Sequence, residues 1–431
     1  MKEEVREGYK MTELGEIPNE WQIKNLEDIS CLIDGDRSSR YPGEKDIVEH
    51  GILFLSTQNI IDSKIVYKNC KFITEEKFDE LSKGKLQKND LIITLRGSIG
   101  NVAKFNGDIY DTGFINAQIM IIRSNDINPT YLSKYLISVK SQKQITSISS
   151  GSAQPQLTKS ELKKLKVIVP SEYEQKKIVE ILSNVDEQIE NTEKLIQKNE
   201  ELKKGLMQQL LTKGIGHTEF KKTYLGDIPK EWHIINFFEF VNKIIDFRGR
   251  TPKKLGMDWG NGTILALSAN NVKMGKIDFN LESYYASNEL YEKWMRGNEL
   301  SKGDLVMTME APLGNIAQIP DDEKYILSQR VVALKTNDNI DNEFMKYMLM
   351  SNNVQNQLDV LSTGTTAKGI NQKNLSKVLI ALPKIEEQRK IASILSVLDE
   401  KVEQYKYKKE KLEELKKGLM QNLLTGKLRV I

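Results

Sequence analysis

The second half of this chain repeats its first half, and the best match is a long stretch without a gap. Residues 170–212 align with residues 383–425 at a constant offset of 213, and 24 of the 43 positions are identical. Glu-Glu-Leu-Lys-Lys-Gly-Leu-Met-Gln occurs in both copies, at 200–208 and at 413–421. A duplication of this size predicts two similar bodies related by a pseudo-two-fold axis, which suits a target that also comes in two halves.

Shorter matches extend the repeat towards the beginning of each half. Their offset stays between 211 and 214, so the two halves share one framework. The matching segments are 14–21 with 225–232, 52–60 with 264–272, and 86–94 with 300–308.

Each globular half is predicted to be α+β with a strand-rich core. The matched segments are short, rich in β-branched residues and bounded by Gly, Asn, Asp or Pro, which is typical of strands. Short helical stretches, for example 129–138 and 342–350, lie between them. The predicted strands are 52–55, 91–95, 119–122, 166–169, 305–309, 331–334 and 378–382.

The repeated segments 172–212 and 385–431 are predicted to be long helices. Apolar residues recur at alternating three- and four-residue steps in both, and Pro170 and Pro383 stand just before them. The first segment has a net charge of −3 and the second of +3, so opposite charge favours their pairing. Polar residues interrupt the inward face in the middle, which fits either a solvated surface or a contact site for another subunit.

The chain therefore divides into four parts. We expect a globular domain at 1–171, a central helix at 172–212, a second globular domain at 213–384 and a C-terminal helix at 385–431. At ~1.5 Å per residue, helices of this length are rods about 60 Å long.

Between the matched segments the two copies diverge. Residues 34–42 and 246–254 occupy the same place with different sequences, and Arg-Gly-Ser at 96–98 stands where Glu-Ala-Pro stands at 310–312. A shared scaffold with different loops is expected when the loops carry function. Neutral drift of surface loops is the alternative explanation.

The composition excludes several classes of protein. No run approaches the length of apolar sequence that spans a membrane, and the N-terminus lacks the apolar core of a signal peptide, so we expect a cytoplasmic protein. Two cysteines and three histidines show no metal-ligand spacing. A net charge of +3 says little, because a balanced total can hide local basic density.

No motif in the chain predicts catalysis. The sequence contains no GxxxxGK[ST] and no Asn/Asp-Pro-Pro-aromatic motif, and no carboxylate pair or His/Cys group repeats in both halves. A duplicated enzyme should show its motif twice. We therefore expect no catalytic residues.

The divergent loops carry side chains that bind nucleic acid. Arg and Lys can contact phosphates or guanine edges, Asn and Gln can pair with adenine, and Ser and Thr with either. Singly, such residues are more often solvated surface, but here they cluster in unlike loops of a repeated scaffold. The candidates are Arg37, Ser38, Arg40, Tyr41, Gln58, Asn59, Arg96, Ser98 and Gln154 in the first half, and Arg248, Arg250, Lys253, Lys254, Asn270, Asn271 and Lys368 in the second.

In combination, these features resemble the specificity (S) subunit of type I restriction–modification systems over essentially the whole chain. The resemblance is carried by the duplication, the Leu-Gly-(Glu/Asp)-Ile-Pro-x-Glu-Trp opening of each half, Pro170-x3-Glu174-Gln175 and the Leu-Lys-Lys-Gly-Leu-Met-Gln helix endings. Gly-Ser-Ala-Gln-Pro-Gln-Leu at 151–157 also matches, whereas the second copy loses its glutamines at 364–370.

The resemblance implies a DNA-reading subunit without activity of its own, in a prokaryotic cytoplasm. Each globular half would be a target recognition domain that reads one half of a split, asymmetric sequence in double-stranded DNA. The helices would form an antiparallel coiled coil that fixes the unread spacer and docks two methyltransferase (modification) subunits. The docking candidates are Ile178, Leu182, Leu206, Ile391, Leu395 and Leu419.

The resemblance also places the cofactors on other subunits. S-adenosylmethionine would bind the modification subunits, and ATP and Mg would bind restriction subunits, of which two could complete the complex. Two alternatives remain open for this chain. One is a protein-binding scaffold that docks two partner copies without touching DNA, and the other is a hidden methyltransferase that binds S-adenosylmethionine itself.

Overall fold

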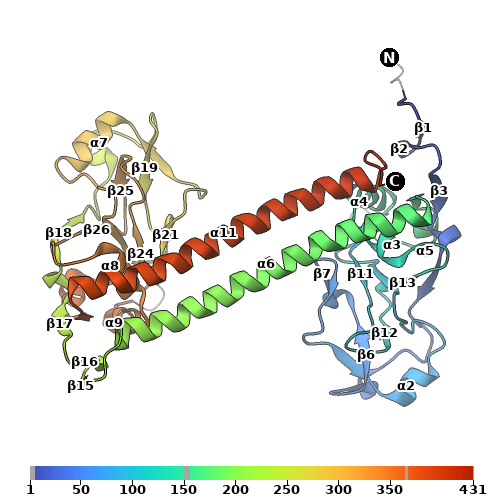
Figure 1. Ribbon diagram of the computed structural model, residues 1–431, viewed down its shortest axis with the longest axis horizontal. Coiled ribbons are helices and arrows are strands. Elements are labelled where there is room, and N and C mark those ends of the chain that lie inside the picture. Colours follow the sequence, from blue (N-terminus) through green and yellow to red (C-terminus); the bar gives the residue numbers. More distant parts are fainter. Residues whose placement is uncertain (1–4, 150–155, 365–366, 431) are drawn as a thin grey trace. The chain divides into compact units, whose positions relative to one another are not determined.

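The chain forms two units that each combine one globular domain with part of both long helices. The computed structural model describes residues 5–149, 156–364 and 367–430 (Figure 1). Unit 1 comprises Met1–Thr192 and Lys408–Ile431, and unit 2 comprises Glu193–Tyr407. None of the helices in the described ranges has an apolar stretch that could cross a membrane.

Two four-stranded sheets form the domain of unit 1. One contains β4 (Ser30–Asp34), β10 (Leu91–Thr94), β11 (Val102–Lys104) and β13 (Ile119–Ser124), and the other β5 (Ile47–Val48), β6 (Ile52–Leu55), β9 (Lys71–Ile73) and β12 (Gly113–Ile115). The first sheet is antiparallel in the order β11-β10-β13-β4. The second has the order β12-β6-β9-β5, and its β12 and β6 are parallel.

The domain of unit 2 repeats this topology. Its strands are β18 (Val241–Asp246), β23 (Leu305–Met309), β24 (Leu313–Gln318) and β26 (Val331–Thr336), with β19 (Ile264–Leu267), β22 (Tyr284–Ala286) and β25 (Tyr325–Leu327). The order β24-β23-β26-β18 matches the first sheet of unit 1 strand for strand, and β25-β19-β22 matches β12-β6-β9 of the second sheet, without an equivalent of β5. The predicted strands are thus confirmed, with shifts of one or two residues at their ends.

Short hairpins, ribbons and helices complete the two domains. In unit 1 these are β1 (Tyr9–Thr12), β2 (Gly15–Pro18), β3 (Gln22–Asn25), β7 (Ile60–Ile61), β8 (Lys64–Ile65), β14 (Lys166–Val169), α1 (Leu26–Ile29), α2 (Glu75–Glu80), α3 (Pro129–Leu136), α4 (Val139–Ile148) and α5 (Lys159–Lys163). In unit 2 they are β15 (Phe220–Thr223), β16 (Gly226–Pro229), β17 (His233–Asn236), β20 (Val272–Lys273), β21 (Lys276–Ile277), β27 (Leu379–Leu382), α7 (Asn288–Met295), α8 (Asn342–Met350), α9 (Asn352–Leu361) and α10 (Gln372–Leu375).

Helices α3 and α8 begin at equivalent caps. The Asn128 side chain accepts a hydrogen bond from the backbone of Tyr131 at 3.1 Å, and the Asp341 side chain accepts one from Phe344 at 2.9 Å. Such caps satisfy N–H groups that the first helical turn leaves unpaired. The polar residue before each apolar run therefore sets where the helix starts.

The long helices are α6 (Glu172–Lys213) and α11 (Ile385–Leu423). In each unit their segments run side by side and antiparallel (Figure 1). Lys416 Nζ lies 2.7 Å from Asp186 Oδ1 in unit 1, and Lys203 pairs with Asp399 in unit 2, again at an offset of 213. The C-terminal helix ends at Leu423, short of the predicted end at 431, because Thr425 and Gly426 turn the chain back onto the domain.

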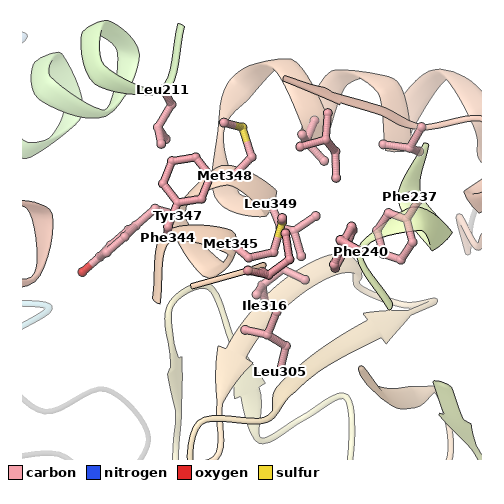
Figure 2. Packing of buried hydrophobic residues seen from close by; sticks show 14 of the residues in the cluster. Leu211, Phe237, Phe240, Leu305, Ile316, Phe344, Met345, Tyr347, Met348 and Leu349 are labelled. Carbon is pink, nitrogen blue, oxygen red and sulfur yellow. The ribbon is translucent and has the colours of Figure 1, made fainter. Parts of the chain in front are cut away.

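Each core includes the beginning of one long helix and the end of the other. In unit 2, α8 packs Phe344, Met345 and Leu349 near Leu305 and Ile316 of the sheet (Figure 2). The long helices add Leu210, Leu211, Ile391 and Leu395 to this core, and Ile178, Leu182 and Leu423 to that of unit 1.

This packing corrects the docking residues predicted from the sequence. Ile178, Leu182, Ile391 and Leu395 are 0% exposed, and Leu206 and Leu419 are partly buried against the same cores. Their apolar periodicity reflects attachment of the helix ends to the domain cores. The prediction that the four buried side chains dock a partner is wrong.

A buried carboxylate joins three segments in unit 1. Glu174, 3% exposed, stands in the first turn of α6 and accepts hydrogen bonds from the Trp21 indole Nε1 and from Arg429 Nε, both at 2.9 Å. Trp21 belongs to the domain, and Arg429 follows the end of α11. We call Trp21, Glu174 and Arg429 the clasp of unit 1.

Unit 2 has the equivalent clasp with one change of chemistry. Glu387, in the first turn of α11, accepts from Trp232 Nε1 at 3.1 Å, and His217 Nε2 lies 2.9 Å from its carboxylate. The backbone N–H of Ile215 donates to the same carboxylate at 2.9 Å. His217 follows α6 as Arg429 follows α11, so an imidazole stands where unit 1 has a guanidinium.

We predict that Arg429→Ala destabilises unit 1 by about 1–3 kcal/mol, because the buried Glu174 carboxylate loses its charged donor. Arg429→Lys should lose less, since it keeps the charge. Thermal unfolding followed by circular dichroism would measure both, with Lys427→Ala as the control because Lys427 is exposed. Equal melting temperatures for the Ala variant and the native chain would contradict a stabilising clasp.

Candidate nucleic-acid interface

Four loops of unit 1 meet at one edge of its two sheets. β4 and β10 both end opposite the start of β13, since Asp34 pairs with Met120 and Thr94 with Ile119. The parallel strands β6 and β12 end at the same edge, with Leu55 beside Ile115. The loops that follow these strands, residues 35–41, 56–59, 95–98 and 116–118, form the loop edge of unit 1.

Two backbone hydrogen bonds join the sheets at this edge. Asn116 N donates to Leu55 O at 2.9 Å, and Leu95 N donates to Gln118 O at 2.8 Å. The loop 116–118 therefore lies between the loops after β6 and β10. This topology brings together side chains that are up to about 80 residues apart in the sequence.

The structure gathers most of the candidates of the first half on this loop edge. Arg37, Ser38, Arg40, Tyr41, Gln58, Arg96 and Ser98 are exposed there. The Arg37 guanidinium donates to Ala117 O at 2.9 Å, and that of Arg40 to Glu80 O at 3.2 Å. Gln154 lies outside the described residues.

Asp36 fixes the first of these loops. Its carboxylate is buried and accepts from Ser38 N at 2.9 Å, Ser82 Oγ at 3.0 Å and Ser82 N at 3.1 Å. These bonds, Ser38 first, hold the pKa of Asp36 well below its usual range. The stabilisation that the Asp36 carboxylate gives the folded state is therefore fully present above the ordinary aspartate pKa. It is lost as the pH falls through the lower pKa that Asp36 has in the folded state.

A hollow of about 530 Å³ opens beside the loop edge of unit 1. Tyr41 and Phe54 form an aromatic wall, with ring centroids 6.1 Å apart. Polar side chains line the rest, and several of them were missed in the sequence: Lys68, Asn69, Lys71, Asn116 and Gln118, which accompany Gln58. Amides and lysines around an aromatic wall can contact base edges and phosphates.

Unit 2 builds the same edge with different side chains. Ser328 N donates to Leu267 O and Met309 N donates to Arg330 O, both at 2.8 Å, which repeats the two bonds of unit 1. The loops after β18, β19, β23 and β25, residues 247–254, 268–271, 310–312 and 328–330, form the loop edge of unit 2. Arg330, exposed in the last of them, was also missed.

Some basic candidates of unit 2 form ion pairs or hydrogen bonds within the chain, and others are exposed. Arg248 Nη2 lies 2.6 Å from Asp246 Oδ2, Lys254 Nζ donates to Gly249 O at 2.7 Å, and Lys368 pairs with Asp359. Lys253 and Asn270 are exposed. Arg248 is therefore oriented by Asp246, and its charge is partly neutralised.

Two asparagines prove to be structural. Asn59 is 6% exposed and Asn271 0%, and each accepts a hydrogen bond from the backbone of the serine three residues before it, at 2.9 and 3.3 Å. Both also donate to a carbonyl seven residues further on. They hold the turn after β6 and β19, so the prediction that they read DNA is wrong. Because both copies of the repeat have an asparagine at this place, the sequence already indicated a structural role.

Arg250 also faces inward. Its guanidinium donates to Trp294 O at 2.9 Å and to Lys293 O at 3.3 Å, at the end of α7. It lies 5.1 Å from the Trp294 ring centroid and 5.2 Å from that of Phe247. A half-buried guanidinium engaged in this way stabilises the loop, so we no longer assign it to DNA.

In the described part of the chain, His, Cys, Asp and Glu nowhere gather in a group of three or more that could hold a metal ion.

Comparison with known proteins gives consistent matches. The family of the type I restriction modification DNA specificity domain matches twice, at residues 18–202 and 229–414. A protein of Methanocaldococcus jannaschii assigned as the specificity subunit of type I restriction enzyme MjaX is 31% identical, over 98% of this chain and 97% of its own. The MjaVIII specificity subunit of the same organism is 28% identical, over 96% of this chain and 94% of its own.

Solved structures share the fold. The type I restriction–modification S subunit from M. genitalium superposes with a TM-score of 0.56 at 17% identity, covering 94% of this chain and 96% of its own. A chain from a study of complex assembly and conformational transition in the type I R-M system gives 0.57 at 17% identity, covering 96% and 99%.

We predict that Arg250→Ala lowers the stability of unit 2 by about 1–2 kcal/mol, through lost hydrogen bonds and cation–π contacts. Lys253→Ala is the matched control, because it removes a positive charge from the same loop without a packed contact. Urea unfolding would measure both. If the Arg250→Ala variant were as stable as the native chain but bound nucleic acid more weakly, Arg250 would be a DNA-contacting residue after all.

Proposed function

Because the chain belongs to the type I restriction modification DNA specificity family, we propose that it is the DNA-reading subunit of a methyltransferase or restriction complex. The observation that carries this proposal is the pair of loop edges. One framework is built twice, down to its backbone hydrogen bonds, and carries unlike polar side chains at the same places. Two different sets of loops on one scaffold can read two different half-sites.

Each unit would contact one half of a split sequence in double-stranded DNA. At the loop edge of unit 1, exposed Arg96, Gln58 and Gln118 can reach base edges, and Lys68 and Lys71 can contact phosphates. At that of unit 2, Lys253 and Arg330 supply positive charge. The paired helices would set the distance between the half-sites.

The partners would be two methyltransferase subunits, each on an equivalent surface. Leu202 on α6 and Leu415 on α11 are equivalent positions, 51% and 50% exposed. Each unit also has a hollow against the end of a long helix, about 860 Å³ around Met420 in unit 1 and 290 Å³ around Met207 in unit 2. Exposed apolar surface of this kind favours a protein partner. Restriction subunits would then bind to the complex of this chain and the methyltransferase subunits.

Methyl transfer would belong to the partner. We propose that S-adenosylmethionine binds the methyltransferase subunits, and ATP and Mg the restriction subunits, so that this chain contributes recognition only. A scaffold that docks partners without contacting DNA is less favoured, because it would not need two different loop edges.

Methylome sequencing tests the main proposal. A host that carries this chain with its methyltransferase subunit should show adenine methylation at a two-part motif with a gap. The same host with the methyltransferase subunit alone is the control, and should lack the motif. An ungapped motif, or none in the complete complex, would count against bipartite reading and favour the scaffold.

The cofactor assignment has its own test. Titration calorimetry should detect no binding of S-adenosylmethionine to the isolated chain, whereas the complex with the methyltransferase subunit should bind it. Binding to the isolated chain would instead support the alternative that this chain is itself a methyltransferase.

A further inference from the structure

Positions 118 and 330 occupy the same place in the two units. They are separated by an offset of 212, and each ends the loop that leads into β13 or β26. The backbone oxygen of each accepts a 2.8 Å hydrogen bond, from Leu95 at Gln118 and from Met309 at Arg330. Their side chains therefore leave the two loop edges from matching points of the backbone.

Both side chains retain the capacity to bind another molecule. Gln118 is exposed, and its carboxamide oxygen lies 3.5 Å from Thr57 Oγ1, at the limit of a hydrogen bond. Arg330 is exposed, and within the described residues its guanidinium makes no hydrogen bond or ion pair. Arg37 and Arg250, in contrast, already donate to carbonyls of their own units.

Arg330 also holds an unfavourable backbone conformation. Its φ of 67° lies in the left-handed region, which residues with a Cβ rarely adopt. Glycine would occupy this point with less strain. Strained residues concentrate at functional sites, so an arginine here indicates that its side chain is needed.

The two side chains match different bases. A carboxamide can donate to N7 of adenine through its NH₂ group and accept from N6 through its oxygen, whereas a guanidinium can donate to both O6 and N7 of guanine. We propose that position 118 reads an adenine in the half-site of unit 1, and that position 330 reads a guanine at the equivalent place in the half-site of unit 2. This inference rests on the proposed function and names the bases that one position of each unit selects.

Exchanging the two side chains tests the inference. The complex with the methyltransferase subunit would select binding sites from random DNA duplexes. Gln118→Arg should change the preference at one base pair of one half-site from adenine to guanine, by about 5- to 100-fold, and leave the other half-site unchanged. Arg330→Gln should do the reverse in the second half-site.

The controls make comparable changes of charge before the neighbouring strands β10 and β23, at the ends that lie away from the loop edges. Gln87 and Lys302 are exposed in the turns before β10 and β23, so Gln87→Arg and Lys302→Gln should select the native sequence. Arg330→Gly relieves the strained backbone and should unfold at the native temperature or above, yet lose the guanine preference.

Three outcomes would overturn the inference. These are unchanged base preferences in the Gln118 and Arg330 variants, a guanine preference that survives Arg330→Gly, and weaker binding to all sequences without a change of preference. If the native complex selected no two-part sequence at all, the proposed function itself would fail. A two-part sequence that the variants leave unaltered would reject this inference alone.

Discussion

A carboxylate in the first turn of each long helix, buried in unit 1 and partly buried in unit 2, ties that helix to its domain and to the chain that follows the other long helix. Glu174 and Glu387 lie where the helix dipole favours negative charge, and each accepts the indole N–H of a domain tryptophan. Each also receives a group from the chain that follows the other long helix. Removing the carboxylate would break hydrogen bonds to two other segments at once, and only the apolar packing of the core would then join the two helices to the domain.

The clasps and the loop edges lie on different parts of each domain. The clasp joins the helix ends to the hairpin before β3 or β17, whereas the loop edge follows the ends of the sheet strands. Framework residues are therefore matched between the copies, as Asp186 and Asp399 show by pairing with equivalent lysines. Residues at the loop edges can differ without disturbing that framework, which is the physical basis for two unlike specificities on one scaffold.

The repeat allowed the strands, both long helices and the divergent loops to be predicted, because matched segments had to share a core. Which loop side chains remain free could not be predicted. Arg37 is engaged by Ala117 and Arg250 by Trp294, through contacts that depend on chain far away in the sequence. Gln118 and Arg330 escaped notice because they look like ordinary residues until the sheets place them beside the other loops. Apolar periodicity predicted the helices correctly, but it could not distinguish attachment to a domain from docking of a partner.

Tryptophan fluorescence can report on the clasp of unit 1. Of the four tryptophans in the chain, Trp21 is the one that belongs to unit 1, and its indole is the donor to Glu174. Trp232, Trp259 and Trp294 all belong to unit 2. Replacing these three with phenylalanine would leave Trp21, in the clasp of unit 1, as the only source of tryptophan emission. Opening of that clasp would then be visible as a change in fluorescence, separately from events in the other half of the chain.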